Sequence, residues 1–137
     1  MFEAYMVCEA GFKNLREKGQ IVGFQVLSRI SNWRGMPLSL IEDVGVVVDG
    51  ERFSRNRIRV SLGGHSYSLD EMKDRVDARW QFDEIAVIAV AKPGGLAAGL
   101  HDVEVIQQFR TGLAALSPAL AVRPVPIVGK RRMTLTA

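Results

Sequence analysis

Residues that could carry out chemistry are few in this chain and lie far apart. The two histidines are His65, directly after the turn residues Gly63 and Gly64, and His101, at the start of an expected strand. A metal site needs several histidine, cysteine or carboxylate ligands at close spacing, and neither histidine has another histidine or a cysteine within four residues. We therefore expect structural or solvent-exposed roles for both histidines, and no metal site in this chain.

Covalent catalysis is not indicated either. The single cysteine, Cys8, lies in an expected strand, where a free thiol behaves as a small buried apolar group. The sequence contains no Gly-x-Ser-x-Gly motif and no phosphate-binding glycine loop. The neighbouring carboxylates Asp70 and Glu71 are explained by a helix start at Ser68. The sequence thus predicts no catalytic residue in this chain.

One loop combines residue types that favour an interface. Between residues 29 and 39 the chain brings together tryptophan, arginine, methionine and proline. Trp, Arg and Met are enriched at interface cores because large or planar side chains gain most from losing water. The alternative is that Trp33 covers the end of the domain's own core. The candidate partner interface consists of Arg29, Trp33, Arg34, Met36, Pro37 and Trp80.

The elements that would position this loop are those of an all-β protein. Short runs of β-branched and aromatic residues are separated by Gly, Pro, Asp or Asn. Residues 58–62 alternate between apolar and polar, as a half-buried antiparallel strand requires, and Asp49-Gly50 favours a two-residue hairpin turn. Ser68 and Glu71 have the spacing of a capping box, which predicts a short helix. We predict an antiparallel β-sandwich with one short helical turn and an extended C-terminal arm.

Other strands are expected at residues 4–9, 20–30, 84–92 and 101–110. Gly23 interrupts the second of these and indicates a β-bulge. The run 84–92 is rich in Ile, Val and Ala with little alternation, so we expect it to be buried on both faces.

The chain changes character after Gly112. Residues 113–137 contain Pro118, Pro124 and Pro126, and no charged residue precedes Arg123. Proline has no amide hydrogen to donate to a sheet, which excludes a central strand there. We divide the chain into a β-sandwich domain at 1–112 and an apolar C-terminal arm at 113–137, which would cover its own domain or another chain.

Composition is that of one globular domain. The chain has 137 residues, 47% of them hydrophobic and 24% charged. Most of its net charge of +3 lies at Lys130-Arg131-Arg132, whereas charges of both signs are interspersed over residues 13–110, so no nucleic-acid-binding face is predicted. No apolar run reaches the roughly 18 residues of a membrane span, and we expect no signal peptide. A single cysteine fits a reducing compartment, so we expect a cytoplasmic protein.

Several motifs together resemble one family. The most specific is Arg-Gly-x-Pro-Leu-Ser at residues 34–39. Others, matched by order and spacing, are Phe-Lys-Asn-Leu-Arg at 12–16, Val-Asp-Gly-Glu at 48–51, Ser-Leu-Asp-Glu-Met at 68–72, Arg-Trp-Gln-Phe at 79–82 and His-Asp-Val-Glu-Val at 101–105. Over residues 12–110 the chain resembles the small (beta) subunit of bacterial C-glycoside deglycosidases.

The resemblance implies a β-sandwich subunit that assembles with a larger alpha subunit into a hetero-oligomer. That partner would be a TIM barrel holding a divalent metal, Mn²⁺, whereas this chain would hold no cofactor. The substrate would be a plant C-glycoside, such as a flavonoid C-glycoside, already oxidised to its 3-keto sugar. A base would remove the acidified C2 proton, the metal would stabilise the enolate, and the C1–aryl bond would break by β-elimination, as in a carbon–carbon lyase.

The small subunit itself would support assembly. We expect Trp33, Arg34 and Met36 to dock on the alpha subunit and shape the mouth of its active site. Two other classes stay open. A free-standing β-sandwich carbohydrate-binding module would bind sugar as a monomer through exposed aromatic residues, and a stand-alone β-barrel enzyme would turn over substrate without a partner.

Overall fold

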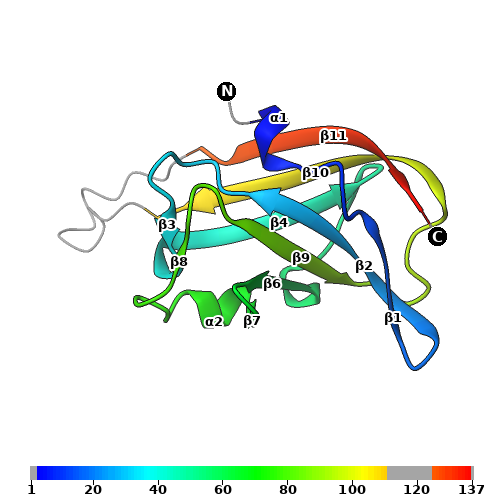
Figure 1. Ribbon diagram of the computed structural model, residues 1–137, viewed down its shortest axis with the longest axis horizontal. Coiled ribbons are helices and arrows are strands. Elements are labelled where there is room, and N and C mark those ends of the chain that lie inside the picture. Colours follow the sequence, from blue (N-terminus) through cyan, green and yellow to red (C-terminus); the bar gives the residue numbers. More distant parts are fainter. Residues whose placement is uncertain (1–2, 111–124, 137) are drawn as a thin grey trace.

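Two antiparallel sheets that face each other make up most of the molecule (Figure 1). The computed structural model describes residues 3–110 and 125–136. Strands dominate these residues, and the fold class predicted from the sequence, an all-β sandwich, is confirmed. None of the helices in the described ranges is long and apolar enough to cross a membrane.

The larger sheet has five strands in the order β1-β2-β9-β6-β7. These strands are β1 (Lys13–Glu17), β2 (Gln20–Arg29), β9 (Ile85–Ala91), β6 (Ile58–Leu62) and β7 (His65–Ser68). The pairing of β1 with β2 shifts register beside Gly23. The β-bulge expected at this glycine is therefore confirmed.

The second sheet has four strands in the order β11-β10-β4-β5. They are β11 (Ile127–Leu135), β10 (Gly99–Phe109), β4 (Ile41–Val48) and β5 (Glu51–Arg52). Asp49 and Gly50 join β4 to β5 with φ angles of 50° and 85°. Positive φ at both central residues is what a type I′ turn requires, so the hairpin predicted at this dipeptide is confirmed.

Shorter elements complete the fold. A two-stranded ribbon pairs β3 (Met36–Pro37) with β8 (Arg79–Trp80). The helical turns are α1 (Glu3–Met6), α2 (Leu69–Met72), η1 (Leu38–Leu40) and η2 (Arg55–Arg57). The capping box predicted for α2 is present, because the Ser68 hydroxyl accepts from the Glu71 amide and the Glu71 carboxylate accepts from the Ser68 amide.

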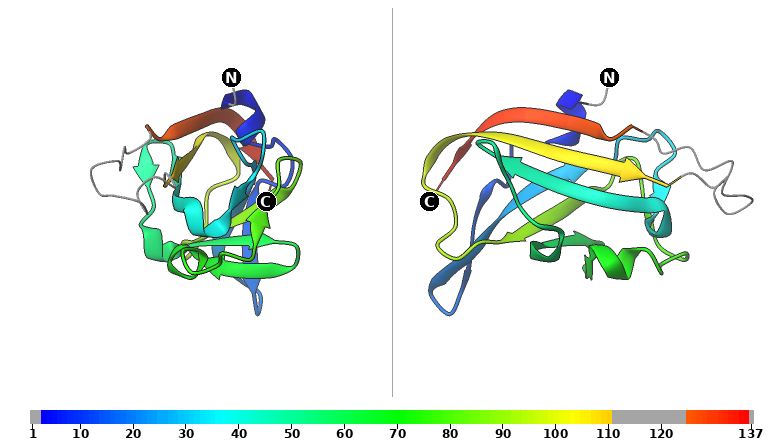
Figure 2. Two further views of the ribbon diagram at one scale, coloured as in Figure 1. Left: turned by 90° about the vertical axis from the view of Figure 1, so that its left-hand side faces the viewer. Right: turned by 180° about the vertical axis from the view of Figure 1, so that it is seen from behind.

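The core lies between the sheets, which curve around it when the molecule is viewed nearly along the strands (Figure 2). Alternate residues of each long strand point inward, so that one face of each sheet is apolar. Aromatic rings join the layers: Phe53 lies edge-on to Phe24 at 5.2 Å between ring centroids.

Two strand predictions need correction. Residues 4–9 are not a strand: Glu3–Met6 form the helical turn α1, and only Val7 bridges to Ser28 of β2. Met6, Val7 and Cys8 are buried in succession, a pattern that a helical turn running into extended chain also produces. In β9, only the alternate residues Ala86, Ile88 and Val90 are fully buried, and the residues between them are half-buried or exposed. The sequence misled because both faces of β9 carry apolar side chains.

The described part of the C-terminal segment belongs to the sandwich itself. β11 pairs with β10 along its whole length, so residues 127–135 form an edge strand rather than an arm. The strand begins directly after Pro126, as expected from proline's missing amide hydrogen. Residues 111–124, with the boundary expected at residue 112, lie outside the described residues.

Candidate functional site

The loop between β2 and β3 is a compact turn, which we call the 31–35 loop. Its start is buried at Ser31, which is 3% exposed. The Asn32 side-chain oxygen accepts from the Arg34 amide at 2.9 Å, and the Asn32 carbonyl accepts from the Gly35 amide at 3.0 Å. Gly35 has a φ of 67°, a conformation that favours glycine. The turn therefore projects residues 33 and 34 outward.

Trp33 lies in a cluster of three aromatic side chains at this end of the sandwich. The Trp33 ring is 4.7 Å from the Phe82 ring, and Phe82 stacks on Tyr5 at 5.2 Å with an interplanar angle of 13°. The Tyr5 hydroxyl also donates to the Phe82 carbonyl at 2.7 Å. We call Tyr5, Trp33 and Phe82 the aromatic cluster. Although supported in this way, Trp33 remains 63% exposed, which favours a binding surface over a cover for the core.

Arginines surround the aromatic cluster. The Arg29 guanidinium lies 5.1 Å from the centroid of the Tyr5 ring, within the range of a cation–π contact. Arg79 donates to the Arg34 carbonyl at 2.9 Å and so ties β8 to the 31–35 loop. Both Arg34 and Arg79 are exposed. A planar cation beside aromatic rings is a typical composition for an interface core.

The structure thus brings most of the predicted interface residues together. Met36 and Pro37 form β3 directly after the loop and are half-buried. Trp80 is different: it is 0% exposed, and its indole donates to the Glu84 carbonyl at 2.9 Å. A fully buried side chain presents nothing to a partner, so the assignment of Trp80 to the interface is corrected. Trp80 supports the loop from within the core, because it pairs with Met36 in the β3–β8 ribbon.

Sequence reasoning missed Tyr5 as part of this surface. Tyr5 was expected in a strand, whereas it lies on α1 and meets Phe82 from a position 77 residues away in the sequence. No local pattern signals that contact. Phe82, the last residue of the Arg-Trp-Gln-Phe motif at 79–82, lies between Tyr5 and Trp33 at the centre of the aromatic cluster.

The two histidines have separate surroundings. His65 is exposed in β7, directly after the turn that joins β6 to β7. His101 bridges two acceptors, with Nδ1 2.6 Å from the Asp49 carboxylate and Nε2 2.6 Å from the Ala97 carbonyl. Partial burial disfavours the charged form, but the Ala97 carbonyl and the Asp49 carboxylate outweigh it and raise the pKa of His101. These contacts fit the structural role that we expected.

Within residues 3–110 and 125–136, no group of three or more His, Cys, Asp or Glu side chains is arranged to hold a metal ion. Cys8 is buried, as predicted, and its sulfur accepts from the Arg29 guanidinium at 3.2 Å. Asp70 and Glu71 start α2, which is the role that the sequence indicates.

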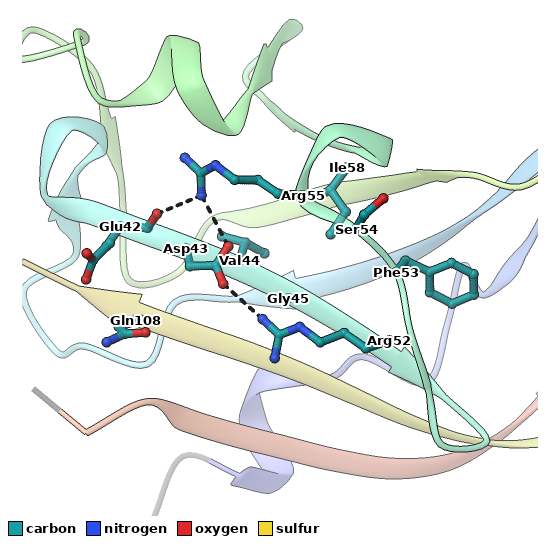
Figure 3. A pocket seen from close by; sticks show the side chains of 10 residues that line it. All are labelled: Glu42, Asp43, Val44, Gly45, Arg52, Phe53, Ser54, Arg55, Ile58 and Gln108. Carbon is teal, nitrogen blue, oxygen red and sulfur yellow. Dashed lines mark hydrogen bonds and ion pairs between the residues drawn. The ribbon is translucent and has the colours of Figure 1, made fainter.

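A surface pocket of about 480 Å³ lies beside β4, at the open edge of the sandwich (Figure 3). Asp43 pairs with Arg52 at 3.0 Å and with Arg55 at 3.3 Å, and Arg55 also pairs with Asp70 at 3.2 Å. Exposed pairs of this kind contribute roughly 0–1 kcal/mol each. Because these charges neutralise one another and Arg55 joins β4 to α2, we assign the pocket a structural role.

The fold and the 31–35 loop together define a β-sandwich protein with an exposed aromatic and arginine-rich surface at one end. Comparison with known proteins gives the family. Residues 2–112 match the C-glycoside deglycosidase beta subunit family, and the chain belongs to that family.

Three curated relatives agree with this assignment. The C-glycoside deglycosidase beta subunit of Eubacterium cellulosolvens is 33% identical over 103 residues, which cover 74% of this chain and 70% of that protein. The 3'-dehydrocarminate deglycosidase beta subunit of a Microbacterium species is 34% identical over 83 residues, 60% of this chain and 61% of that protein. The C-glycoside deglycosidase beta subunit of Arthrobacter globiformis is 27% identical over 97 residues, 70% and 74% of the respective chains.

Proposed function

We propose that this chain is the non-catalytic beta subunit of a heteromeric C-glycoside deglycosidase. The observation that carries the proposal is the family match over residues 2–112, together with relatives that are named as deglycosidase beta subunits. A beta subunit needs a surface for its partner, and the exposed 31–35 loop with the aromatic cluster meets that need.

The reaction of the complex would be cleavage of the C1–aryl bond in a 3-keto C-glycoside, such as an oxidised flavonoid C-glycoside. The C3 ketone acidifies the C2 proton, which a base of the alpha subunit removes. The electron pair then forms the C1–C2 double bond, and the aryl carbon leaves with the C1–aryl pair and takes up a proton. We assign this cytoplasmic lyase chemistry, and the divalent metal Mn²⁺, to a TIM-barrel alpha subunit.

The role of this chain is to bind the alpha subunit at the mouth of its active site. Trp33 supplies the largest exposed apolar surface of the 31–35 loop, and Arg34 supplies a planar cation beside it. Such residues dominate the binding free energy of many interfaces when they become fully desolvated. Met36 and Pro37 at the edge of the loop would complete the contact.

Alanine substitution at Trp33 tests this role. We expect Trp33→Ala to weaken binding to the alpha subunit by about 2 kcal/mol or more, roughly thirtyfold in Kd, because an interface tryptophan near the centre carries that much. The Kd is measured by titration calorimetry with the purified alpha subunit. Leu100→Ala is the matched control, since Leu100 is also 63% exposed but lies at the start of β10, towards the opposite end of the sandwich (Figure 1).

An unchanged Kd for Trp33→Ala would contradict the proposed interface. If the chain does not bind the alpha subunit and binds glycans as a monomer, the subunit assignment is contradicted. The chain would then be a carbohydrate-binding module instead.

A further inference from the structure

A polar cluster lies inside the apolar core, beneath the 31–35 loop. Its members are Ser28 at the end of β2, Ser31 in the loop, and Gln107 in β10. They are 0%, 3% and 0% exposed, and they are the buried polar side chains among the residues that the structure describes. A glutamine amide at such a position loses its water entirely, so every group of the cluster must find partners within the protein.

Gln107 spans the two sheets and holds the first residue of the loop. Its Oε1 accepts from the Ser31 amide at 2.9 Å and from the Ser31 hydroxyl at 2.6 Å. Its Nε2 donates to the Arg29 carbonyl at 2.8 Å and to the Ser28 hydroxyl at 3.4 Å. The Gln107 amide thus bonds both Arg29, the last residue of β2, and Ser31, the first residue of the 31–35 loop. These residues lie 78 and 76 positions away in the sequence.

The far end of the same loop is fixed by close packing. A Cβ atom added to Gly35 would lie 2.6 Å from the Trp80 carbonyl oxygen, so the loop backbone rests directly on β8. The hydrogen bonds from Arg34 and Gly35 to Asn32 close the turn between these two anchors. The loop that carries Trp33 is therefore anchored at both ends, by Gln107 at Ser31 and by β8 at Gly35.

We propose that Gln107 is a positioning residue that pre-organises the 31–35 loop for binding the alpha subunit. The proposal rests on the proposed function. An apolar side chain of similar size would fill the core without the desolvation penalty of a buried amide. What the amide adds is a defined geometry for the loop, and a loop that is already ordered loses less conformational entropy when the partner binds.

The first test uses the full chain alone, with Gln107→Met, which keeps the volume and removes the amide. We expect amide hydrogen exchange at Ser31 and residues 32–35 to accelerate at least tenfold, while exchange in β6 is unchanged. Ser31→Ala, a milder change, should accelerate the same amides less. Ser28→Ala is the matched control, because Ser28 belongs to the cluster without holding the loop. Unchanged exchange in both Gln107→Met and Ser31→Ala would overturn the proposal.

The second test measures binding of the alpha subunit. We expect Gln107→Met to raise Kd at least tenfold in the wild-type background, and to have less than a twofold effect when Trp33→Ala is already present. Equal effects in both backgrounds, or a loosened loop with unchanged Kd, would overturn the positioning role. If the wild-type chain does not bind the alpha subunit at all, the proposed function fails, and the exchange result still decides whether Gln107 orders the loop.

Discussion

At the scale of single residues, the charge of His101 is coupled to the fold. Its ring lies between the Asp49 carboxylate of the β4–β5 turn and the Ala97 carbonyl, and the side chain is only 11% exposed. Two acceptors on the two ring nitrogens favour the doubly protonated imidazolium. The Asp49 carboxylate also accepts from the Asp102 amide at 2.8 Å, and Asp102 pairs with Arg132 of β11. The histidine thus links the hairpin to the β10–β11 edge.

This linkage predicts a pH-dependent part of the stability. Because the pKa of His101 is raised above its ordinary value of 6.5, its contribution is fully present below pH 6.5 and is lost as the pH rises through the higher folded-state value. We expect the free energy of unfolding, measured with urea between pH 6 and pH 9, to fall with rising pH. Asp49→Asn should reduce that fall. His65→Gln, at the exposed histidine, should leave it unchanged, and a wild-type stability that is flat over this range would contradict the assignment.

At the scale of elements, the pairing of β2 with β9 depends on the close approach of one glycine. A Cβ atom added to Gly23 would run into the Val90 carbonyl oxygen, which is backbone and has no room to move aside. Gly64 is a useful contrast. It has a φ of 85° in the turn before β7, and nothing lies within 4 Å of an added Cβ.

The two glycines therefore predict different losses on substitution. Gly23→Ala should lower the free energy of unfolding by about 3 kcal/mol or more, because the strands must separate to admit the methyl group. Gly64→Ala should cost only about 1–2 kcal/mol, the penalty of a left-handed conformation. Urea unfolding of the two variants makes the comparison, and equal losses would show that the β2–β9 contact tolerates a side chain.

Local signals in the sequence predicted several elements correctly. The Asp49-Gly50 turn and the Ser68 capping box each depend on neighbouring residues, so a few side chains specify them. The strand predicted at residues 4–9 was wrong because the four residues of α1 are too few to show helical periodicity. The burial of Met6 and Val7 is also compatible with a strand.

The candidate site was predicted only in part, because its geometry depends on distant contacts. Residue types alone made Trp33 and Arg34 candidates for an interface, but they left open whether Trp33 covers the core. In contrast, two hydrogen bonds join residues more than 70 positions apart: Tyr5 to Phe82, and Ser31 to Gln107. The pairing of β3 with β8, which buries Trp80, also has no local signature. Side chains fixed by such pairings become visible only in the folded chain.

At the scale of the whole molecule, contacts between distant elements join the described part of the sandwich at both of its ends. Thr136 bridges to Lys13 of β1, which links the edge of the four-stranded sheet to the edge of the five-stranded sheet. At the other end, the β3–β8 ribbon and the aromatic cluster support the 31–35 loop. This arrangement holds an exposed loop on a well-packed scaffold, which is what the proposed role as a supporting subunit requires.

The most direct test of the subunit assignment is reconstitution of the activity. The chain is co-expressed with the proposed TIM-barrel alpha subunit, and release of the aglycone from a 3-keto C-glycoside is measured with added Mn²⁺ for the complex and for each chain alone. We predict that the two chains co-purify and that the aglycone is released only when both are present. Equal turnover by the alpha subunit alone, or failure of the two chains to associate, would contradict the assignment.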